Sequence, residues 1–133
     1  VGYGIMSPEL VDHIIDIKSP YNVNVAAEAA LLASLEDAPA LLGNVAKIVS
    51  ERDRLNVVLE EMPGITPWPS EGNFILCQLA NSEEASRVYE ALASRGIFVR
   101  NFGSERLQDT FRVAIGTPDQ TDAFIAALKE ILK

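Results

Sequence analysis

The sequence predicts an α+β fold, in which an antiparallel sheet is covered by helices and a helical arm precedes it. Three observations lead to this fold class. Residues 7–62 show helical patterns, and the apolar phrase 1–6 before them resembles the end of a strand or a loop. The remainder reads as strand, helix, strand, strand and helix. Turn signals rich in glycine, proline and asparagine separate these elements, so each is short and well delimited.

The N-terminal half is expected to form three helices. Ser7–Glu9 has the composition of a helix start, with serine as N-cap, proline at the first position and an acidic residue near the helix N-terminus. An apolar stripe then runs to Lys18. The alanine- and leucine-rich segment 25–36 predicts a second helix, and the segment 37–61 predicts a third. These helices make up the predicted arm.

Two short apolar runs in the C-terminal half each carry one arginine. Residues 97–100 and 110–115 are rich in β-branched and aromatic residues, so both predict strands. Side chains alternate between the faces of a strand, and Arg100 and Arg112 therefore point away from the core side. If the strands pair, the two guanidinium groups converge on one surface, which suits a carboxylate or phosphate. The alternative is two solvated surface arginines.

The other elements of this half follow from local signals. The prolines of segment 65–69 confine it to a sheet edge or a loop. Residues 73–79 predict a strand. Capping-box patterns at 81–84 and 117–120 begin two further helices, and Gly96 ends the first of them. Together they complete the βαββα pattern.

The composition indicates a globular protein and argues against several kinds of partner and site. The chain has 133 residues, a net charge of -8 and 48% hydrophobic residues, as expected of one globular domain or a domain with an arm. The acidic balance argues against nucleic acid and membrane surfaces as partners. The single cysteine, Cys77, reads as a small core residue, and one histidine with one cysteine cannot build a zinc site. The composition fits a cytoplasmic protein.

Five phrases, taken together, resemble the C-terminal third of histidinol-phosphate aminotransferases, which are fold-type I, pyridoxal-phosphate-dependent class I/II aminotransferases. The phrases cover essentially the whole chain in order. They are Val1-Gly2-Tyr3-Gly4-Ile5, Pro20-Tyr21-Asn22-Val23-Asn24, Glu71-Gly72-Asn73-Phe74, Gly96-Ile97-Phe98-Val99-Arg100 and Phe111-Arg112-Val113-Ala114-Ile115-Gly116-Thr117-Pro118. Each phrase alone is weak, whereas the second and fifth together are fairly specific.

The resemblance implies roles for five residues. Arg112 matches the arginine that clamps the substrate α-carboxylate, and Arg100 matches an arginine near the substrate phosphate. Asn73 matches an asparagine that we interpret as fixing a turn. Tyr21 and Asn22 match the link between the large and small domains, near the cleft, where a structural role is the simpler interpretation.

The resemblance also implies a division of the chain and a parent reaction. Residues 1–24 correspond to the end of the large cofactor domain and the link, 25–62 to a helical arm, and 63–133 to the small domain. The parent would exchange an amino group between histidinol phosphate and a 2-oxo acid such as 2-oxoglutarate, in histidine synthesis. It would work as a homodimer.

The departures from the family pattern concern the cofactor. The lysine that forms the Schiff base with pyridoxal 5'-phosphate precedes the region matched here, and the four lysines present are outside its context: Lys18, Lys47, Lys129 and Lys133. We therefore expect pyridoxal 5'-phosphate in the parent but none bound by this chain, no catalytic residue, no metal ligand and no activity of the chain alone.

Two other interpretations stay open on the sequence. The chain fits an independent α+β module that binds a small anion or regulates another protein. The parent also fits a related aminotransferase or decarboxylase with another substrate, such as an aromatic amino acid or threonine phosphate, because Arg112 suits any α-amino acid.

Overall fold

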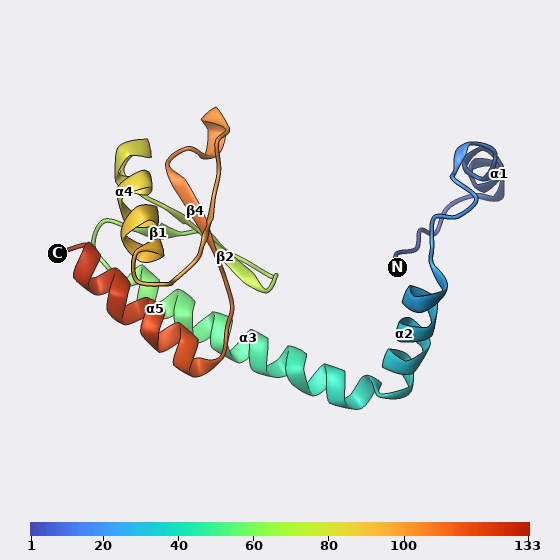
Figure 1. The fold of residues 1–133 in the computed structure, drawn as a ribbon, viewed down its shortest axis with the longest axis horizontal. Helices are drawn as coiled ribbons and strands as arrows, with labels where there is room; N and C mark the ends of the chain where they lie inside the picture. The colour runs from blue at the N-terminus through green and yellow to red at the C-terminus, as the bar shows by residue number, and fades with distance from the viewer. The chain divides into compact units, whose positions relative to one another are not determined.

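The computed structural model describes residues 1–133, which divide into two compact units, 1–43 and 44–133. Figure 1 shows the helices and strands along the chain. The helices are α1 (Pro8–Ile17), α2 (Val25–Glu36), α3 (Ala38–Glu60), α4 (Ser82–Ala93), α5 (Pro118–Ile131) and the short 3-10 helix η1 (Glu105–Leu107). The strands are β1 (Thr66–Pro67), β2 (Phe74–Gln78), β3 (Arg100–Asn101) and β4 (Thr110–Ala114). The predicted α+β class is confirmed.

The second unit is built on a four-stranded sheet with the order β1-β2-β4-β3, in which every neighbouring pair is antiparallel. β2 and β4 form its centre, with Ile75 opposite Val113 and Cys77 opposite Phe111. The predicted extended segment at 65–69 supplies β1 at the edge, where Pro67 lacks an N–H that an inner strand would need. The sheet is thus the predicted βαββα core with one additional short edge strand.

The predicted strand 97–100 is wrong over most of its length, because only Arg100 and Asn101 pair with β4. The reason lies at the end of α4. The backbone N–H of Ile97 donates to the carbonyl of Leu92 at 3.0 Å, so this group closes the helix and is not free for a ladder. Ile97 and Val99 still pack against the core as partly buried side chains. Burial therefore follows the predicted alternation even where strand pairing does not.

The core lies between one face of the sheet and three helices. Ile75, Cys77, Phe111 and Val113 supply the sheet side and are at most 7% exposed. The rings of Phe111 and Phe124 meet edge to face, with centroids 6.4 Å apart, an arrangement that aromatic pairs prefer. The helix side consists of buried residues from α3, α4 and α5: Leu55, Leu59, Ala85, Val88, Leu92, Phe124, Ile125, Ala127, Leu128 and Ile131. The helix predicted to begin at the capping-box pattern 117–120 thus contributes one face to the core.

Side chains cap the helices largely where the sequence predicts. The Oγ of Ser7 accepts from the N–H of Leu10 at 3.4 Å, as predicted. The amide oxygen of Asn24, a cap that the sequence analysis did not identify, accepts from the N–H of Ala27 at 2.8 Å. At α5, Gln120 accepts from the N–H of Thr117 at 3.0 Å, as a capping box requires.

The capping box predicted at 81–84 is only half formed. Asn81 accepts from the N–H of Glu84 at 2.9 Å. The carboxylate of Glu84 pairs instead with Arg87, one turn further along α4. A charged partner on the same helix face thus draws the glutamate away from the cap.

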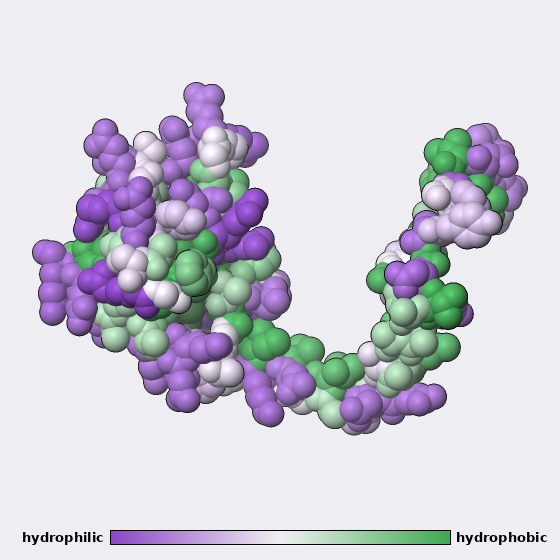
Figure 2. All heavy atoms as spheres, in the orientation of Figure 1, coloured by the Kyte–Doolittle hydropathy of each residue, from purple (hydrophilic) through white to green (hydrophobic).

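The first unit contains no buried residue in α1 or α2. Large apolar side chains are exposed there, including Ile5 at 91% and Ile17 at 84%. Figure 2 shows hydrophobic residues on the surface of α2. Helices of 10 and 12 residues are marginal without tertiary packing. Residues 1–43 therefore lack a core of their own in this structure.

Replacing Gly96 with alanine is expected to destabilise the second unit by about 1–2 kcal/mol, because Gly96 has φ +75° after α4. No atom lies within 4 Å of the position of an added Cβ, so the cost comes from the backbone alone. Gly103→Ala is the control, since it also meets no atom and its φ is not positive. Urea unfolding measures the free energy of unfolding of both variants, and equal values would contradict the backbone argument.

Candidate functional site

The face of the sheet opposite the helices carries the two arginines singled out by the sequence. Arg100 of β3 and Arg112 of β4 are register partners, and Arg112 is also paired with Leu76 of β2. Both arginines are exposed. Partners in an antiparallel pair place their Cβ atoms about 4.5–5.5 Å apart on the same face. The structure thus brings Arg100 and Arg112 together, as the two runs predict.

The charge on this face is not balanced by carboxylates. The ion pairs within 4.0 Å in the chain involve Arg52, Arg54, Arg87 and Arg95, and neither Arg100 nor Arg112 is among them. Like charges directly opposite one another on a sheet repel, so the arrangement costs stability. Two unpaired guanidinium groups in a row form a local positive site on a chain whose net charge is -8. Its chemistry suits an anion with several oxygens.

Arg112 has an aromatic neighbour on the same face. Its Cζ lies 4.9 Å from the centroid of the Phe74 ring, within the range of a cation–π contact. Phe74 is the register partner of Ala114, which makes it a diagonal neighbour of Arg112 across the β2–β4 pair. The sequence alone does not identify this contact, because the register between β2 and β4 decides it.

Asn73 lies in the turn that leads into β2. Its backbone carbonyl accepts from the N–H of Ile115 at 2.9 Å, which extends the β2–β4 ladder by one residue. Its side chain is exposed and makes no hydrogen bond within the chain. The bonds in this turn are instead made by Ser70, whose Oγ donates to the carbonyl of Phe74 at 2.5 Å and accepts from Gly72 N–H at 3.1 Å. Turn fixing by the Asn73 side chain stays a prediction.

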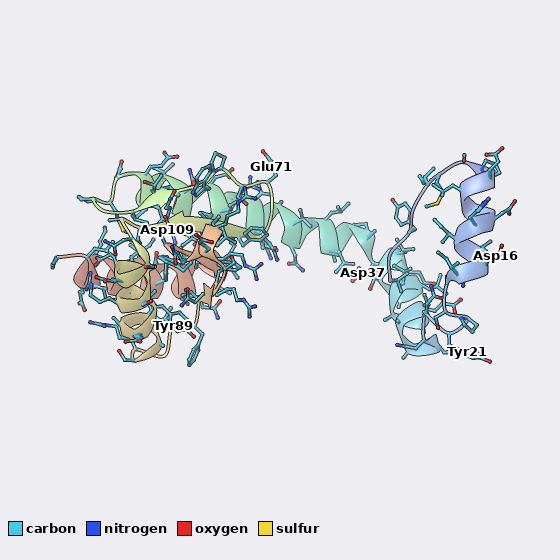
Figure 3. The ribbon with its side chains drawn as sticks, turned by 90° about the horizontal axis from the view of Figure 1, so that it is seen from above. Asp16, Tyr21, Asp37, Glu71, Tyr89 and Asp109 are labelled. Carbon is cyan, nitrogen blue, oxygen red and sulfur yellow. The ribbon has the colours of Figure 1, made fainter.

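Tyr21 and Asn22 belong to the first unit, in the segment between α1 and α2. Figure 3 labels Tyr21. Tyr21 is 93% exposed. The side-chain oxygen of Asn22 accepts from Nζ of Lys18 at 3.4 Å, a local contact beside the end of α1. A role of either residue near a cleft stays a prediction.

A second polar arrangement on the sheet was not predicted. Trp68 Nε1 donates to Gln78 Oε1 at 3.2 Å, and Gln78 Nε2 donates to Asp109 Oδ2 at 2.7 Å. Asp109, labelled in Figure 3, directly precedes β4. The three side chains link the residue after β1, the end of β2 and the residue before β4. Gln78 shares the face of Phe74 by alternation, which is the only sequence signal for its orientation.

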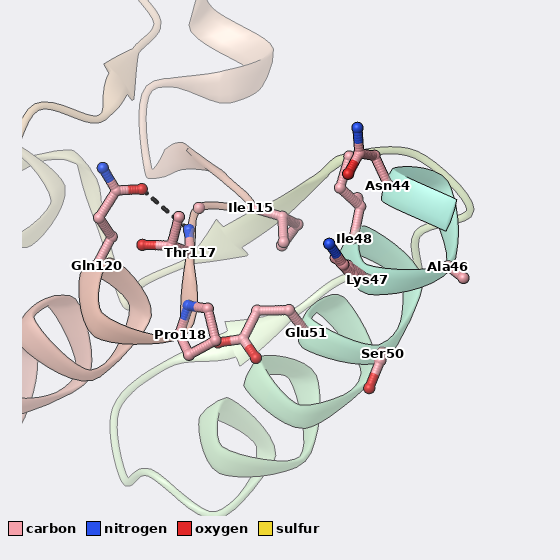
Figure 4. Close-up of a pocket in the computed structure, with 11 residues that line it drawn as sticks. Asn44, Ala46, Lys47, Ile48, Ser50, Glu51, Ile115, Thr117, Pro118 and Gln120 are labelled. Atoms are coloured by element: carbon pink, nitrogen blue, oxygen red, sulfur yellow. Dashed lines mark hydrogen bonds between the residues drawn. The ribbon is translucent and has the colours of Figure 1, made fainter. Parts of the chain in front are cut away.

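A groove of about 770 Å³ lies between α3 and the segment that leads into α5 (Figure 4). Glu51 lines it and is 8% exposed, and its carboxylate accepts from Nη2 of Arg54 at 2.6 Å. Arg54 also donates to Asp122 at 2.8 Å. The Arg54 guanidinium holds the pKa of Glu51 below its ordinary value, against the opposing effect of burial. This cluster ties α3 to α5, which explains its charges structurally.

Cys77 is fully buried in β2. Burial raises the pKa of its thiol to about 12, so it carries no thiolate at neutral pH. The predicted role as a core residue is confirmed. None of the helices combines the length and the hydrophobicity that a membrane span requires. No group of three or more histidine, cysteine, aspartate or glutamate side chains is placed to hold a metal ion.

The chain contains four lysines. None lies on a strand of the sheet: Lys18 caps α1, Lys47 is on α3, Lys129 is on α5 and Lys133 is the last residue. The amine of Lys18 is engaged with Asn22. No lysine is thus a register neighbour of Arg100 or Arg112.

Comparison with known proteins identifies one family. Residues 1–128 match the family model of aminotransferases of class I and II. A histidinol-phosphate aminotransferase from Roseiflexus castenholzii is 42% identical over 133 residues, which cover 98% of this chain and 36% of that protein. The chain thus spans about a third of the length of this relative.

Solved structures agree on the fold. The histidinol-phosphate aminotransferase from Sinorhizobium meliloti, in complex with pyridoxal-5'-phosphate, superposes with a TM-score of 0.79 at 26% identity, over 94% of this chain and 34% of that one. An L-threonine-O-3-phosphate decarboxylase from Porphyromonas gingivalis has a TM-score of 0.80 at 19% identity, over 96% of this chain and 40% of that one. The latter likeness shows the fold alone.

Proposed function

The chain belongs to the class I and II aminotransferases, and from this premise we propose that it forms the substrate-anion-binding part of a longer parent protein. The parent transfers the amino group of histidinol phosphate to a 2-oxo acid, with 2-oxoglutarate as the expected acceptor. The single observation that carries this proposal is the 42% identity to a histidinol-phosphate aminotransferase along nearly the whole chain.

The arginine face supports the proposal chemically. Arg112 sits on a central strand, and its planar fork suits two carboxylate oxygens of an amino acid or 2-oxo acid. Arg100, on the adjacent edge strand, adds the second positive charge that a phosphate ester needs. Their direct register supports the binding of one small dianion by both arginines. We assign substrate binding to Arg112 and Arg100, and no catalytic residue to this chain.

Pyridoxal 5'-phosphate, held elsewhere in the parent, supplies the electron sink for amino-group transfer. This chain's contribution is to bind and orient the anionic end of the substrate. In the parent, residues 1–24 would complete the cofactor domain and the interdomain link, with Tyr21 and Asn22 near the cleft. Residues 25–62 would form the connecting arm and 63–133 the small domain. The chain alone is expected to be inactive.

We further propose that the parent is a cytoplasmic homodimer. The exposed apolar side chains of α1 and α2 support an assembly in which other parts of the protein cover them. Light scattering of the purified parent would measure its mass, and a monomer at micromolar concentration would contradict the dimer.

The test is an assay of the full-length parent loaded with pyridoxal 5'-phosphate. Histidinol phosphate, phenylalanine and threonine phosphate are supplied as competing donors with 2-oxoglutarate, and each product is quantified. Histidinol phosphate is expected to be the preferred donor. Preference for another donor would reassign the substrate, and loss of carbon dioxide from threonine phosphate would indicate the decarboxylase whose fold this chain shares.

A second candidate is an independent module that binds a small anion, which the unpaired arginines favour by themselves. It requires that the 133-residue chain bind phosphate or succinate at millimolar concentration or better, and that Arg112→Ala abolish the binding. The aminotransferase proposal expects binding by the isolated chain too weak to measure by calorimetry.

A further inference from the structure

We propose that Phe74 is a positioning residue, whose ring holds the guanidinium of Arg112 in the orientation that binds the substrate carboxylate. This inference rests on the proposed function for its role in binding. The contact itself stands on the structure, where Cζ of Arg112 lies 4.9 Å from the ring centroid.

Arg112 needs a support because no other group restrains its charged end. It is exposed, has no ion pair within 4.0 Å, and faces the like charge of Arg100 across the β3–β4 pair. Repulsion and rotamer freedom would spread an arginine side chain over many positions. The electron-rich face of an aromatic ring attracts a guanidinium, and thereby favours one of these side-chain positions.

The ring of Phe74 is itself held by the turn that precedes β2. Ser70 Oγ accepts from Gly72 N–H at 3.1 Å and donates to the carbonyl of Phe74 at 2.5 Å, which fixes the backbone on both sides of Asn73. A Cβ added to Gly72 would lie 3.2 Å from Cε1 of Phe74, so glycine there leaves room for the ring. The turn therefore restrains the position of the Phe74 ring, and the ring restrains the guanidinium of Arg112.

The contact is strong enough to matter for affinity and too weak to hold the fold together. Phe74 is 37% exposed, and a cation–π contact at such a site changes an equilibrium by roughly 2–5-fold. Loss of the ring should therefore weaken binding of the carboxylate while the second unit stays folded. A group that acts on ground state and transition state alike changes KM and leaves kcat unaltered.

The first arm of the test is an NMR measurement on the 133-residue chain. In the unaltered chain the Hδ and Hε resonances of Arg112 should be shifted upfield by the ring. Phe74→Leu should abolish the shift and Phe74→Tyr should keep it. Tyr89→Leu is the matched control, since it removes a partly buried aromatic ring on α4, whose helix packs on the other face of the sheet. Arg112 resonances unchanged by Phe74→Leu would overturn the proposal.

The second arm is the steady-state kinetics of the parent. Phe74→Leu should raise KM for the 2-oxo acid about 2–5-fold, with kcat within about twofold of the unaltered enzyme, and Phe74→Tyr should restore KM. A fall in kcat with unchanged KM, or no change in either, would overturn the proposal. Absence of transamination in the unaltered parent would overturn the proposed function instead, and the NMR arm would still decide the contact.

Gly72→Ala keeps the proposal testable if Phe74→Leu does not fold. The added methyl group displaces the ring, while the side chain of Phe74 stays present. We expect the Arg112 resonances to move and KM to rise, by less than in Phe74→Leu. Unchanged resonances in a variant whose Phe74 ring has demonstrably shifted would also count against the inference.

Discussion

Arg112→Ala in the full-length parent is expected to lower kcat/KM for amino donor and 2-oxo acid by about 10²–10³-fold, equivalent to about 3–4 kcal/mol. The substitution removes a bidentate, charge-assisted contact and leaves a substrate anion without its partner. The kcat/KM of Arg112→Lys should lie between the values of the unaltered enzyme and Arg112→Ala, because lysine keeps the charge but lacks the planar fork of arginine. Steady-state kinetics with both substrates would measure these changes.

Arg95→Ala provides the control for the loss of a positive charge. Arg95 follows α4, and its only ion pair is at 3.9 Å, to Glu130 on α5. We expect its kcat/KM to stay within about twofold of the unaltered enzyme, as for surface substitutions away from a site. If Arg95→Ala lost as much activity as Arg112→Ala, the effect would reflect net charge, and Arg112 would have no special role.

Leu128→Ala is expected to destabilise the second unit by about 3–5 kcal/mol. Leu128 is completely buried between α5 and the sheet, so its truncation removes apolar contacts and leaves a cavity. Leu35→Ala in α2 makes the same chemical change at a side chain that is 62% exposed. It should change stability by no more than about 0.5 kcal/mol.

Urea unfolding followed by the fluorescence of Trp68, the only tryptophan, would compare the two variants, since Trp68 lies in the second unit. A large loss in Leu35→Ala would mean that α2 is packed in solution, for instance against a second copy of the chain. A small loss in Leu128→Ala would contradict the described core.

The helix ends were predictable because their signals are local. Ser7 and Asn24 each bond a backbone N–H three residues ahead, and no distant part of the chain is needed for this. The half-formed box at α4 shows the limit of such rules. Asn81 caps as predicted, but Glu84 has a choice of partner, and the charge of Arg87 decides it.

The prediction of a strand at 97–100 was wrong for a reason that the residue types alone do not reveal. Its residues have the right propensity, and Ile97 and Val99 do pack inward. A ladder also needs free backbone groups, and the N–H of Ile97 is already bonded to Leu92. Propensity describes side chains, whereas pairing depends on what each N–H and C=O has already bonded.

The sequence by itself determined the fold class, most helix bounds and the outward direction of Arg112, because each follows from a period of two or 3.6 residues or from a cap. Three features were decided by the tertiary structure alone. β2 pairs with β4 as well as with β1, Arg100 lies opposite Arg112, and the ring of Phe74 contacts the guanidinium of Arg112. Register between strands separated by a helix depends on the packing of the whole core, and no short stretch of sequence contains that information.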